Sequence, residues 1–96
     1  MNSYELINSY LDYLYHHQYP SQIIERRELT FNRFLKTYGE LNHANIIDFM
    51  AANDFLRRRT YNLLKIDLIC LLSFLRHHML IDDSLFRQID KEIDGF

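Results

Sequence analysis

Residues 63–75 read LLKIDLICLLSFL, and ten of these thirteen residues are apolar. A helix that is apolar on nearly every side is one that other elements surround. A membrane-spanning helix is the rival interpretation, but it requires about 20 apolar residues, and Lys65 and Asp67 interrupt this run. The stretch therefore predicts a central helix over residues 58–79, with the other helices packed around it.

Length and composition predict one helical domain. The chain has 96 residues, enough for one small hydrophobic core, so we expect a single domain over residues 1–96. Hydrophobic residues make up 48% and charged residues 25% of the chain, which is typical of a globular protein. Two glycines and one proline leave few sites for tight turns, which argues against a hairpin-rich β fold. We expect an all-α fold, a compact orthogonal four-helix bundle.

Capping residues mark the start of the first two helices. Asn2 and Glu5 have the spacing of a capping box, which predicts a helix over residues 3–17. Pro20 restricts the residue before it, so this helix is expected to end ahead of the proline. Ser21 is the expected cap of the helix that follows.

The same reasoning continues along the chain. The second helix is expected over residues 21–38, ending at a left-handed Gly39. Asn42 is the expected cap of a third helix over residues 43–53, and residues 84–94 are expected to form either a short fifth helix or a tail. Helical spacing places the following residues on the apolar faces: Tyr4, Ile7, Leu11, Leu14, Ile24, Phe31, Phe34, Leu35, Tyr38, Ile46, Ile47, Phe49, Met50, Leu85, Phe86, Ile89 and Ile93. Four basic residues of the second helix are expected largely on its other faces: Arg26, Arg27, Arg33 and Lys36.

Charge is distributed unevenly along the chain. The formal net charge of −2 excludes a histone-like polycation. Residues 21–81 nevertheless carry nine Lys and Arg against six Asp and Glu, while both ends are acidic. The middle of the chain is therefore expected to present a modest basic face, which weakly favours a nucleic-acid partner. No signal peptide is visible at the start of the sequence, so we expect a cytoplasmic protein.

The sequence contains no pattern typical of a catalytic, metal or cofactor site. Glycines only at positions 39 and 95 exclude a glycine-rich phosphate loop. The single cysteine, Cys70, cannot form a Cys-x-x-Cys pair or an internal disulfide, and we expect it to be a small core residue. The five histidines have no metal-ligand spacing, and no Ser/His/Asp set can be assembled. We therefore expect no cofactor, no metal and no catalytic residue.

One constellation points to a ligand. Residues 57–62 read RRRTYN and stand directly before the apolar run. A solvated charge run is the usual explanation of such a segment. Arginine also binds phosphate bidentately, and a threonine hydroxyl or helix N-terminal amides bind phosphate as well. Cations oppose the macrodipole at a helix N-terminus, so an anion bound there would explain the arrangement.

The chain resembles the N-terminal core-binding domain of tyrosine recombinases of the phage-integrase type, which has a SAM-like helical fold. Residues 41–50 are similar to the family's third helix, ψ-T-x-x-D-ψ-x-x-[FY]-ψ, where ψ is apolar. Residues 59–62 and the run after them are similar to the opening of its fourth helix, S-x-x-T-ψ-N, and to the core pattern L-R-x-F-F-x-Y-L. The resemblance covers about residues 4–83.

The resemblance implies a DNA-binding domain that does not itself cut DNA, because the family's catalytic residues lie in a separate domain. The implied partner is double-stranded DNA at a core recombination site, bound mostly through phosphates. Self-association on the DNA is left open, and no membrane or small-molecule partner is implied. The candidate DNA contacts are Arg57, Arg58, Arg59, Thr60, Asn62 and Lys65, with Ser21, Gln22 and Arg26 as weaker candidates.

Two other function classes remain open. A small helical protein-interaction module would dock a partner helix or self-associate through its seven tyrosines. A small enzyme is the least supported class, because no convergent set of polar residues was found. Retention on DNA would favour the first class, and a concentration-dependent mass would favour the interaction module.

Overall fold

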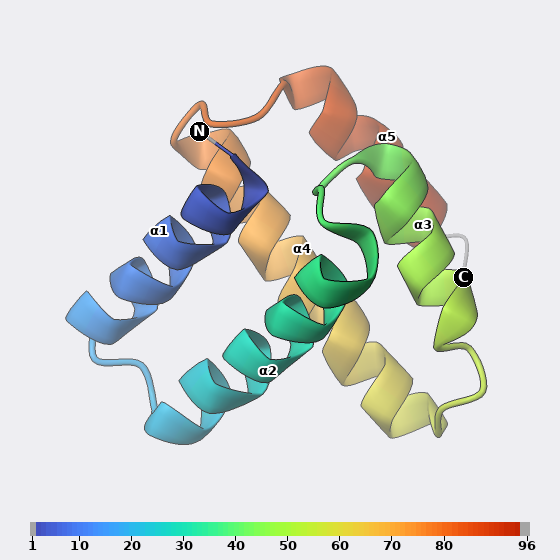
Figure 1. Ribbon diagram of the computed structural model, residues 1–96, viewed down its shortest axis with the longest axis horizontal. Helices are drawn as coiled ribbons and strands as arrows, with labels where there is room; N and C mark the ends of the chain where they lie inside the picture. Colours follow the sequence, from blue (N-terminus) through green and yellow to red (C-terminus); the bar gives the residue numbers. More distant parts are fainter. Residues whose placement is uncertain (1, 95–96) are drawn as a thin grey trace. The chain divides into compact units, whose positions relative to one another are not determined.

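The computed structural model describes residues 2–94, and it contains five α-helices and no strand within that range (Figure 1). The expected all-α class is therefore confirmed. The helices are α1 (Ser3–His16), α2 (Ser21–Tyr38), α3 (His43–Ala52), α4 (Arg58–His77) and α5 (Asp83–Asp94). Their ends agree with the predicted ends to within two residues, and residues 84–94 are part of a helix rather than a tail.

The contacts between helices divide the chain into two compact units. The first unit, Met1–Glu40, contains α1 and α2, and the second, Leu41–Phe96, contains α3, α4 and α5. The organisation of the whole chain as one domain stays a prediction. No helix in the described range has both the length and the apolar character needed to cross a membrane.

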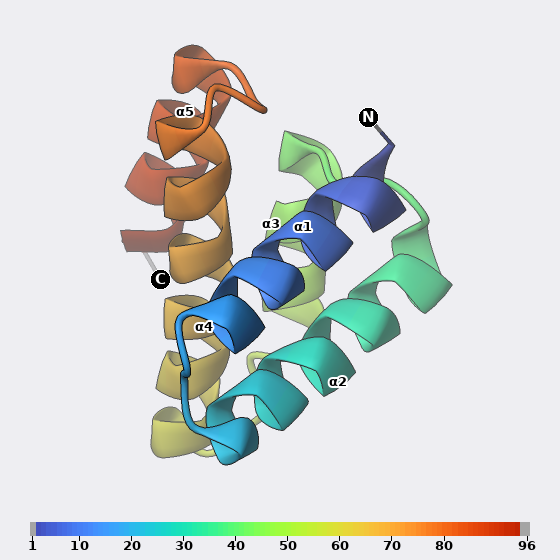
Figure 2. The same cartoon turned by 90° about the vertical axis from the view of Figure 1, so that its left-hand side faces the viewer.

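The first unit is a pair of helices that lie side by side (Figure 2). The rings of Tyr10 on α1 and Phe31 on α2 are 6.1 Å apart between centroids. The Arg27 guanidinium is buried and donates a 2.7 Å hydrogen bond from Nη1 to the Tyr10 hydroxyl. The expectation that Arg27 lies on an outer face is therefore wrong, because a buried partner on α1 satisfies it.

Two other expectations for this unit need correction. Tyr4, expected on the apolar face of α1, is 63% exposed, whereas Leu6 is buried instead. Tyr10, expected to broaden the apolar face, is buried as well. The buried face of α1 is thus rotated from the one predicted. Ser21 does not cap α2: the N-cap is Pro20, which makes no side-chain cap hydrogen bond, and its carbonyl accepts the amide of Ile24 at 3.2 Å.

The second unit is built on α5, which contacts both α3 and α4. Phe86 and Ile89 of α5 are buried, as expected, and the side chain of Ile93 lies outside the described residues. At the polar edge, His43 Nε2 of α3 lies 2.8 Å from Glu92 Oε1 of α5. Arg76 of α4 pairs with Asp83 at 2.6 Å and stacks 4.7 Å from the centroid of the Phe86 ring. These contacts make residues 83–92 an integral part of the unit.

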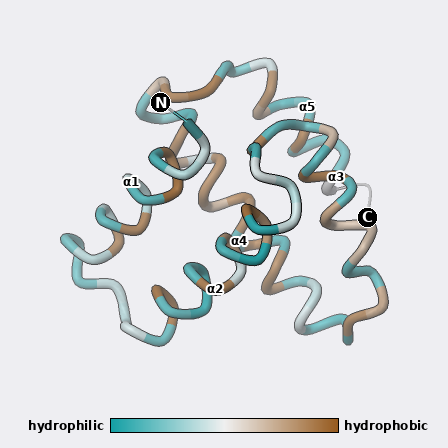
Figure 3. Tube along the Cα trace, in the orientation of Figure 1, coloured by the Kyte–Doolittle hydropathy of each residue, from teal (hydrophilic) through white to brown (hydrophobic). Residues whose placement is uncertain are grey.

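α4 is buried along one side only. Its buried residues recur at helical spacing: Leu64, Asp67, Leu68, Leu71, Leu72 and Leu75. Ile66 is 50% exposed, Ser73 is exposed, and Ile69 and Cys70 are half-buried. Within its own unit, α4 is therefore not surrounded on the face that carries Ile66. The expectation that the helices of the other unit also pack around α4 stays a prediction. Figure 3 shows hydrophilic positions among the hydrophobic ones along α4.

Three of the predicted caps are present. Asn2 Oδ1 accepts the Glu5 amide at 2.8 Å at the start of α1, and Asn42 Oδ1 accepts the Asn45 amide at 2.8 Å at the start of α3. Gly39 ends α2 in the left-handed region, with φ of 74°, and its amide donates to the Leu35 carbonyl at 2.8 Å. Each cap satisfies a backbone group that has no partner inside its helix.

Candidate nucleic-acid interface

The loop between α3 and α4 is fixed by hydrogen bonds. Asn53 is buried, and its Nδ2 donates to the Phe49 carbonyl at 2.7 Å. The backbone amide of Asn53 donates to the Met50 carbonyl at 3.2 Å, and the Leu56 amide donates to the Asn53 carbonyl at 3.2 Å. These bonds order the turn that leads from the end of α3 to Leu56, just before α4 begins.

Three arginines stand at the start of α4, and we call Arg57, Arg58 and Arg59 the arginine cluster. Arg57 is the N-cap residue, with φ of −56° and ψ of 145°, and it makes no side-chain cap hydrogen bond. Its carbonyl accepts the Tyr61 amide at 2.9 Å. The first turn of α4 contains no acidic residue. The positive end of the helix dipole and the positive guanidiniums therefore lie together, and no carboxylate in that turn neutralises them.

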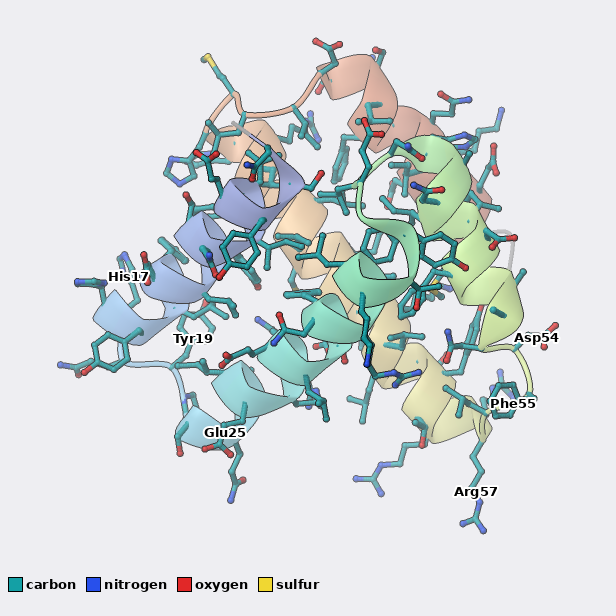
Figure 4. All side chains as sticks on the ribbon, in the orientation of Figure 1. His17, Tyr19, Glu25, Asp54, Phe55 and Arg57 are labelled. Atoms are coloured by element: carbon teal, nitrogen blue, oxygen red, sulfur yellow. The ribbon has the colours of Figure 1, made fainter. Side chains whose placement is uncertain are left out.

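The arginine cluster is exposed, and it makes no ion pair with any side chain that the structure describes. Within the described part of the chain, no carboxylate lies in ion-pair distance of any of its three guanidiniums. Elsewhere in the same unit, Arg76 and Arg87 both pair with Asp83, at 2.6 and 2.8 Å. Figure 4 shows the Arg57 side chain pointing away from the ribbon. The cluster therefore presents charge that the described residues leave uncompensated.

A shallow groove runs from the arginine cluster along the exposed side of α4. One hollow is lined by Arg58, Arg59, Asn62, Leu63 and Ile66. A second hollow is lined by Asn62, Lys65, Ile66, Ile69, Cys70 and Asp90. The two share Asn62 and Ile66, and together we call them the α4 groove. It brings four of the predicted contacts onto one side of the helix, and it places Cys70, expected in the core, on its wall.

The other predicted contacts do not line this groove. Thr60 is exposed, but it lies about 160° from Asn62 around the helix axis, because two residues advance a helix by about 200°. Ser21 and Gln22 are exposed and Arg26 is half-buried in the first turns of α2, in the other unit. A common interface of these three residues with α4 stays a prediction.

Sequence reasoning missed three residues beside the arginine cluster. Phe55, in the loop, is 78% exposed. Asp54 and Tyr61 line a further hollow together with Leu56 and Arg58. The only signal for Phe55 in the sequence is an aromatic residue between the Asn53-Asp54 helix break and three arginines, outside any helical period.

The Tyr61 hydroxyl is distinctive. It is buried and has no hydrogen-bond partner among the residues that the structure describes. Burial raises the pKa of this hydroxyl above its usual value of 10.0, and the negative charge of Asp54 raises it further. Tyr61 is therefore neutral at physiological pH, and it contributes no charge to the site.

Comparisons with known proteins do not identify the chain. No protein-family model, no curated protein and no solved structure matches it. The resemblance to tyrosine recombinases therefore rests on the residue pattern described above. Among the side chains that the structure describes, residues 2–92, no group of three or more His, Cys, Asp or Glu has the arrangement needed to hold a metal ion.

Proposed function

We propose that this protein binds double-stranded DNA as a core-binding-type domain of a tyrosine recombinase, with the arginine cluster as its phosphate-binding surface. The observation that carries the proposal is the presence of three adjacent, exposed guanidiniums with no carboxylate partner in the described range. Elsewhere in the unit, the exposed arginines Arg76 and Arg87 both form ion pairs with Asp83. Exposed guanidiniums with no carboxylate partner in the described range are suited to phosphate, which they bind bidentately.

The α4 groove supports the proposal by extending the polar surface. Asn62 and Lys65 follow Arg58 at successive turns on the same side of the helix. A duplex presents phosphates in a regular row, so a row of donors along a helix has several to contact. The carboxylate of Asp90 borders the far end of the groove, which favours the arginine end as the main contact.

In this role the domain grips the recombination site while a separate domain performs DNA cleavage, and it acts in the cytoplasm. Phosphate contacts supply affinity and position the protein, whereas base contacts supply sequence preference. Asn62 is the groove residue whose amide is suited to reading a base edge. Self-association on DNA is compatible with this role and would place domains on adjacent half-sites.

The test is duplex binding by Arg58→Ala and Arg59→Ala, measured by fluorescence anisotropy at low salt. Each substitution is expected to weaken binding several-fold on duplexes of unrelated sequence, because phosphate contacts carry no sequence information. The matched control is Arg87→Ala. It also removes one positive charge from this unit, but at an exposed arginine that already forms an ion pair with Asp83. Equal losses in all three variants would mean that net charge alone matters, and the proposal would then be wrong.

A protein-interaction module is the second candidate. The observation that favours it is the apolar wall of the α4 groove, where Ile66 is half exposed and Ile69 and Cys70 are partly exposed. A partner helix that buried this wall would gain hydrophobic free energy. Light scattering over a range of concentrations distinguishes self-association from a monomer, and Ile66→Asp would abolish the self-association.

A further inference from the structure

Phe55 is a large aromatic side chain held in solvent at the tip of the α3–α4 loop. It is 78% exposed, although its neighbour Leu56 is half-buried. Single exposed hydrophobic residues are common on protein surfaces, and this chain has others, such as Met79 at 90% exposure. The feature of Phe55 that points to a ligand is its position two residues before the arginine cluster. Figure 4 shows Asp54, Phe55 and Arg57 together on this loop.

The backbone on both sides of Phe55 is hydrogen-bonded. The Asp54 amide donates to the Ala51 carbonyl at 3.3 Å, and the Leu56 amide donates to the Asn53 carbonyl at 3.2 Å. The buried side chain of Asn53 is itself bonded to the end of α3 at Phe49. Phe55 therefore lies between two residues whose backbone amides are hydrogen-bonded.

The charges around Phe55 identify the kind of ligand. Arg57 follows it by two residues, and the whole arginine cluster lies in the same segment. The single carboxylate in the segment is Asp54, so cations outnumber it three to one. A flat apolar ring beside unpaired guanidiniums matches a nucleotide, which joins an aromatic base to an anionic phosphate.

We propose that Phe55 stacks on an unpaired nucleobase while the arginine cluster binds the phosphates that flank it. The protein would then prefer a duplex that contains an unstacked base over a fully paired duplex. This inference rests on the proposed function and adds a structural feature of the DNA to it. Stacking tolerates any base, because every base has a π-face. An already unpaired base favours the contact, because no base pair or stack must be broken first.

An anionic membrane surface is the competing ligand for an exposed aromatic with arginines. Binding in a membrane interface scales with the apolar area that enters it. This loop offers one ring, since Leu56 is half-buried, and it carries the carboxylate of Asp54. One ring is sufficient for base stacking, so the observations favour DNA.

The experiment uses two duplexes of the same sequence, one fully paired and one with a single unpaired 2-aminopurine at its centre. Wild-type protein is expected to bind the bulged duplex roughly tenfold more tightly, and to quench the 2-aminopurine fluorescence on binding. Phe55→Tyr keeps the ring and is expected to retain both effects. Phe55→Ala and Phe55→Leu are expected to lose both while binding the paired duplex as before.

The matched control is Met79→Ala, which removes an apolar side chain that is 90% exposed beyond the far end of α4. It is expected to leave the preference for the bulged duplex unchanged. Circular dichroism checks that every variant keeps its helices, and the exposure of Phe55 means that its substitution removes little packing.

The outcomes separate this inference from the proposed function. Wild-type protein that binds neither duplex overturns both. Binding to both duplexes with no effect of Phe55→Ala on the preference overturns the stacking role alone. A third outcome is that Phe55→Ala weakens binding to vesicles of phosphatidylserine and phosphatidylcholine but leaves DNA binding unchanged. This result also overturns the stacking role, and it assigns the loop to a lipid surface.

Discussion

At the scale of single residues, Tyr61 places a buried hydroxyl where no described residue accepts or donates a hydrogen bond. A buried polar group without a partner loses its hydration and gains nothing in return. The ring itself borders the hollow shared with Asp54 and Arg58. The Tyr61 hydroxyl therefore contributes nothing to the stability of the folded protein.

We predict that Tyr61→Phe leaves the free energy of unfolding unchanged or raises it by about 1 kcal/mol. Urea denaturation measures this change. A loss of stability would mean that the hydroxyl has a partner in solution.

The same substitution has a signature at alkaline pH. The pKa of Tyr61 is raised in the folded protein by burial and then by Asp54, so the unfolded chain releases this proton first as the pH rises. The ionisation of Tyr61 therefore has no effect on the free energy of unfolding below the ordinary pKa of 10.0, and it lowers this free energy as the pH rises above that value. Tyr61→Phe is therefore expected to lose less stability than wild type between neutral pH and pH above 10. Parallel losses in the two proteins would contradict the assignment.

Asp54 gives a second prediction at this scale. Its carboxylate shares a hollow with Arg58 and adds negative charge beside the proposed phosphate site. Asp54→Asn is expected to tighten duplex binding by a few-fold at low salt, with a smaller effect at high salt because screening increases. Asp90→Asn, at the far end of the α4 groove, is the matched control and is expected to have a smaller effect. The contrary outcome is an unchanged or weaker affinity for Asp54→Asn.

At the scale of helices, the ends are set by local chemistry. Gly39 ends α2 with φ of 74°, a conformation that costs most residues free energy because of their Cβ. A Cβ at this position would meet no atom within 4 Å, so the cost of substitution is conformational rather than steric.

Gly39→Ala is thus expected to destabilise the protein by roughly 1 kcal/mol. Gly39→Asn is expected to cost less, because asparagine visits the left-handed region more readily. Thermal denaturation followed by circular dichroism compares the two variants with wild type. An alanine variant as stable as wild type would show that the chain beyond Tyr38 adjusts without strain.

Local chemistry also explains which helical features the sequence predicts. Asn2, Asn42 and Gly39 act within four residues of their own position, so the sequence contains all that their prediction requires. The burial of Arg27 depends on the Tyr10 hydroxyl, 17 residues away, and helical spacing alone treats a charged residue as external. The residue type of Ser21 predicts a capping role, but the carbonyl of Pro20 already accepts the first hydrogen bonds of the helix.

The candidate site was predictable to a similar extent. The three consecutive arginines are evident in the sequence, and the apolar run that follows them predicts their position at the start of a helix. The exposure of Phe55 was not predictable, because a loop residue has no period that assigns it to a face. The α4 groove depends on which side of α4 is left open, which requires tertiary structure.

At the scale of the whole molecule, the charge distribution reconciles a net charge of −2 with an anionic ligand. Both ends of the sequence carry a net negative charge, and Asp83 is already paired with two arginines. Local potential at a binding surface depends on nearby unpaired charge more than on the total. The arginine cluster therefore determines where a polyanion is expected to bind.

The salt dependence of duplex binding tests this central claim most directly. Binding constants of wild type and of the Arg57→Ala/Arg58→Ala/Arg59→Ala variant are measured over a series of salt concentrations. Neutralised phosphates release counterions, so the slope of log K against log salt is expected to flatten by roughly one unit for each arginine removed. A variant whose slope equals that of wild type would show that these guanidiniums do not contact the DNA backbone, and it would contradict the account.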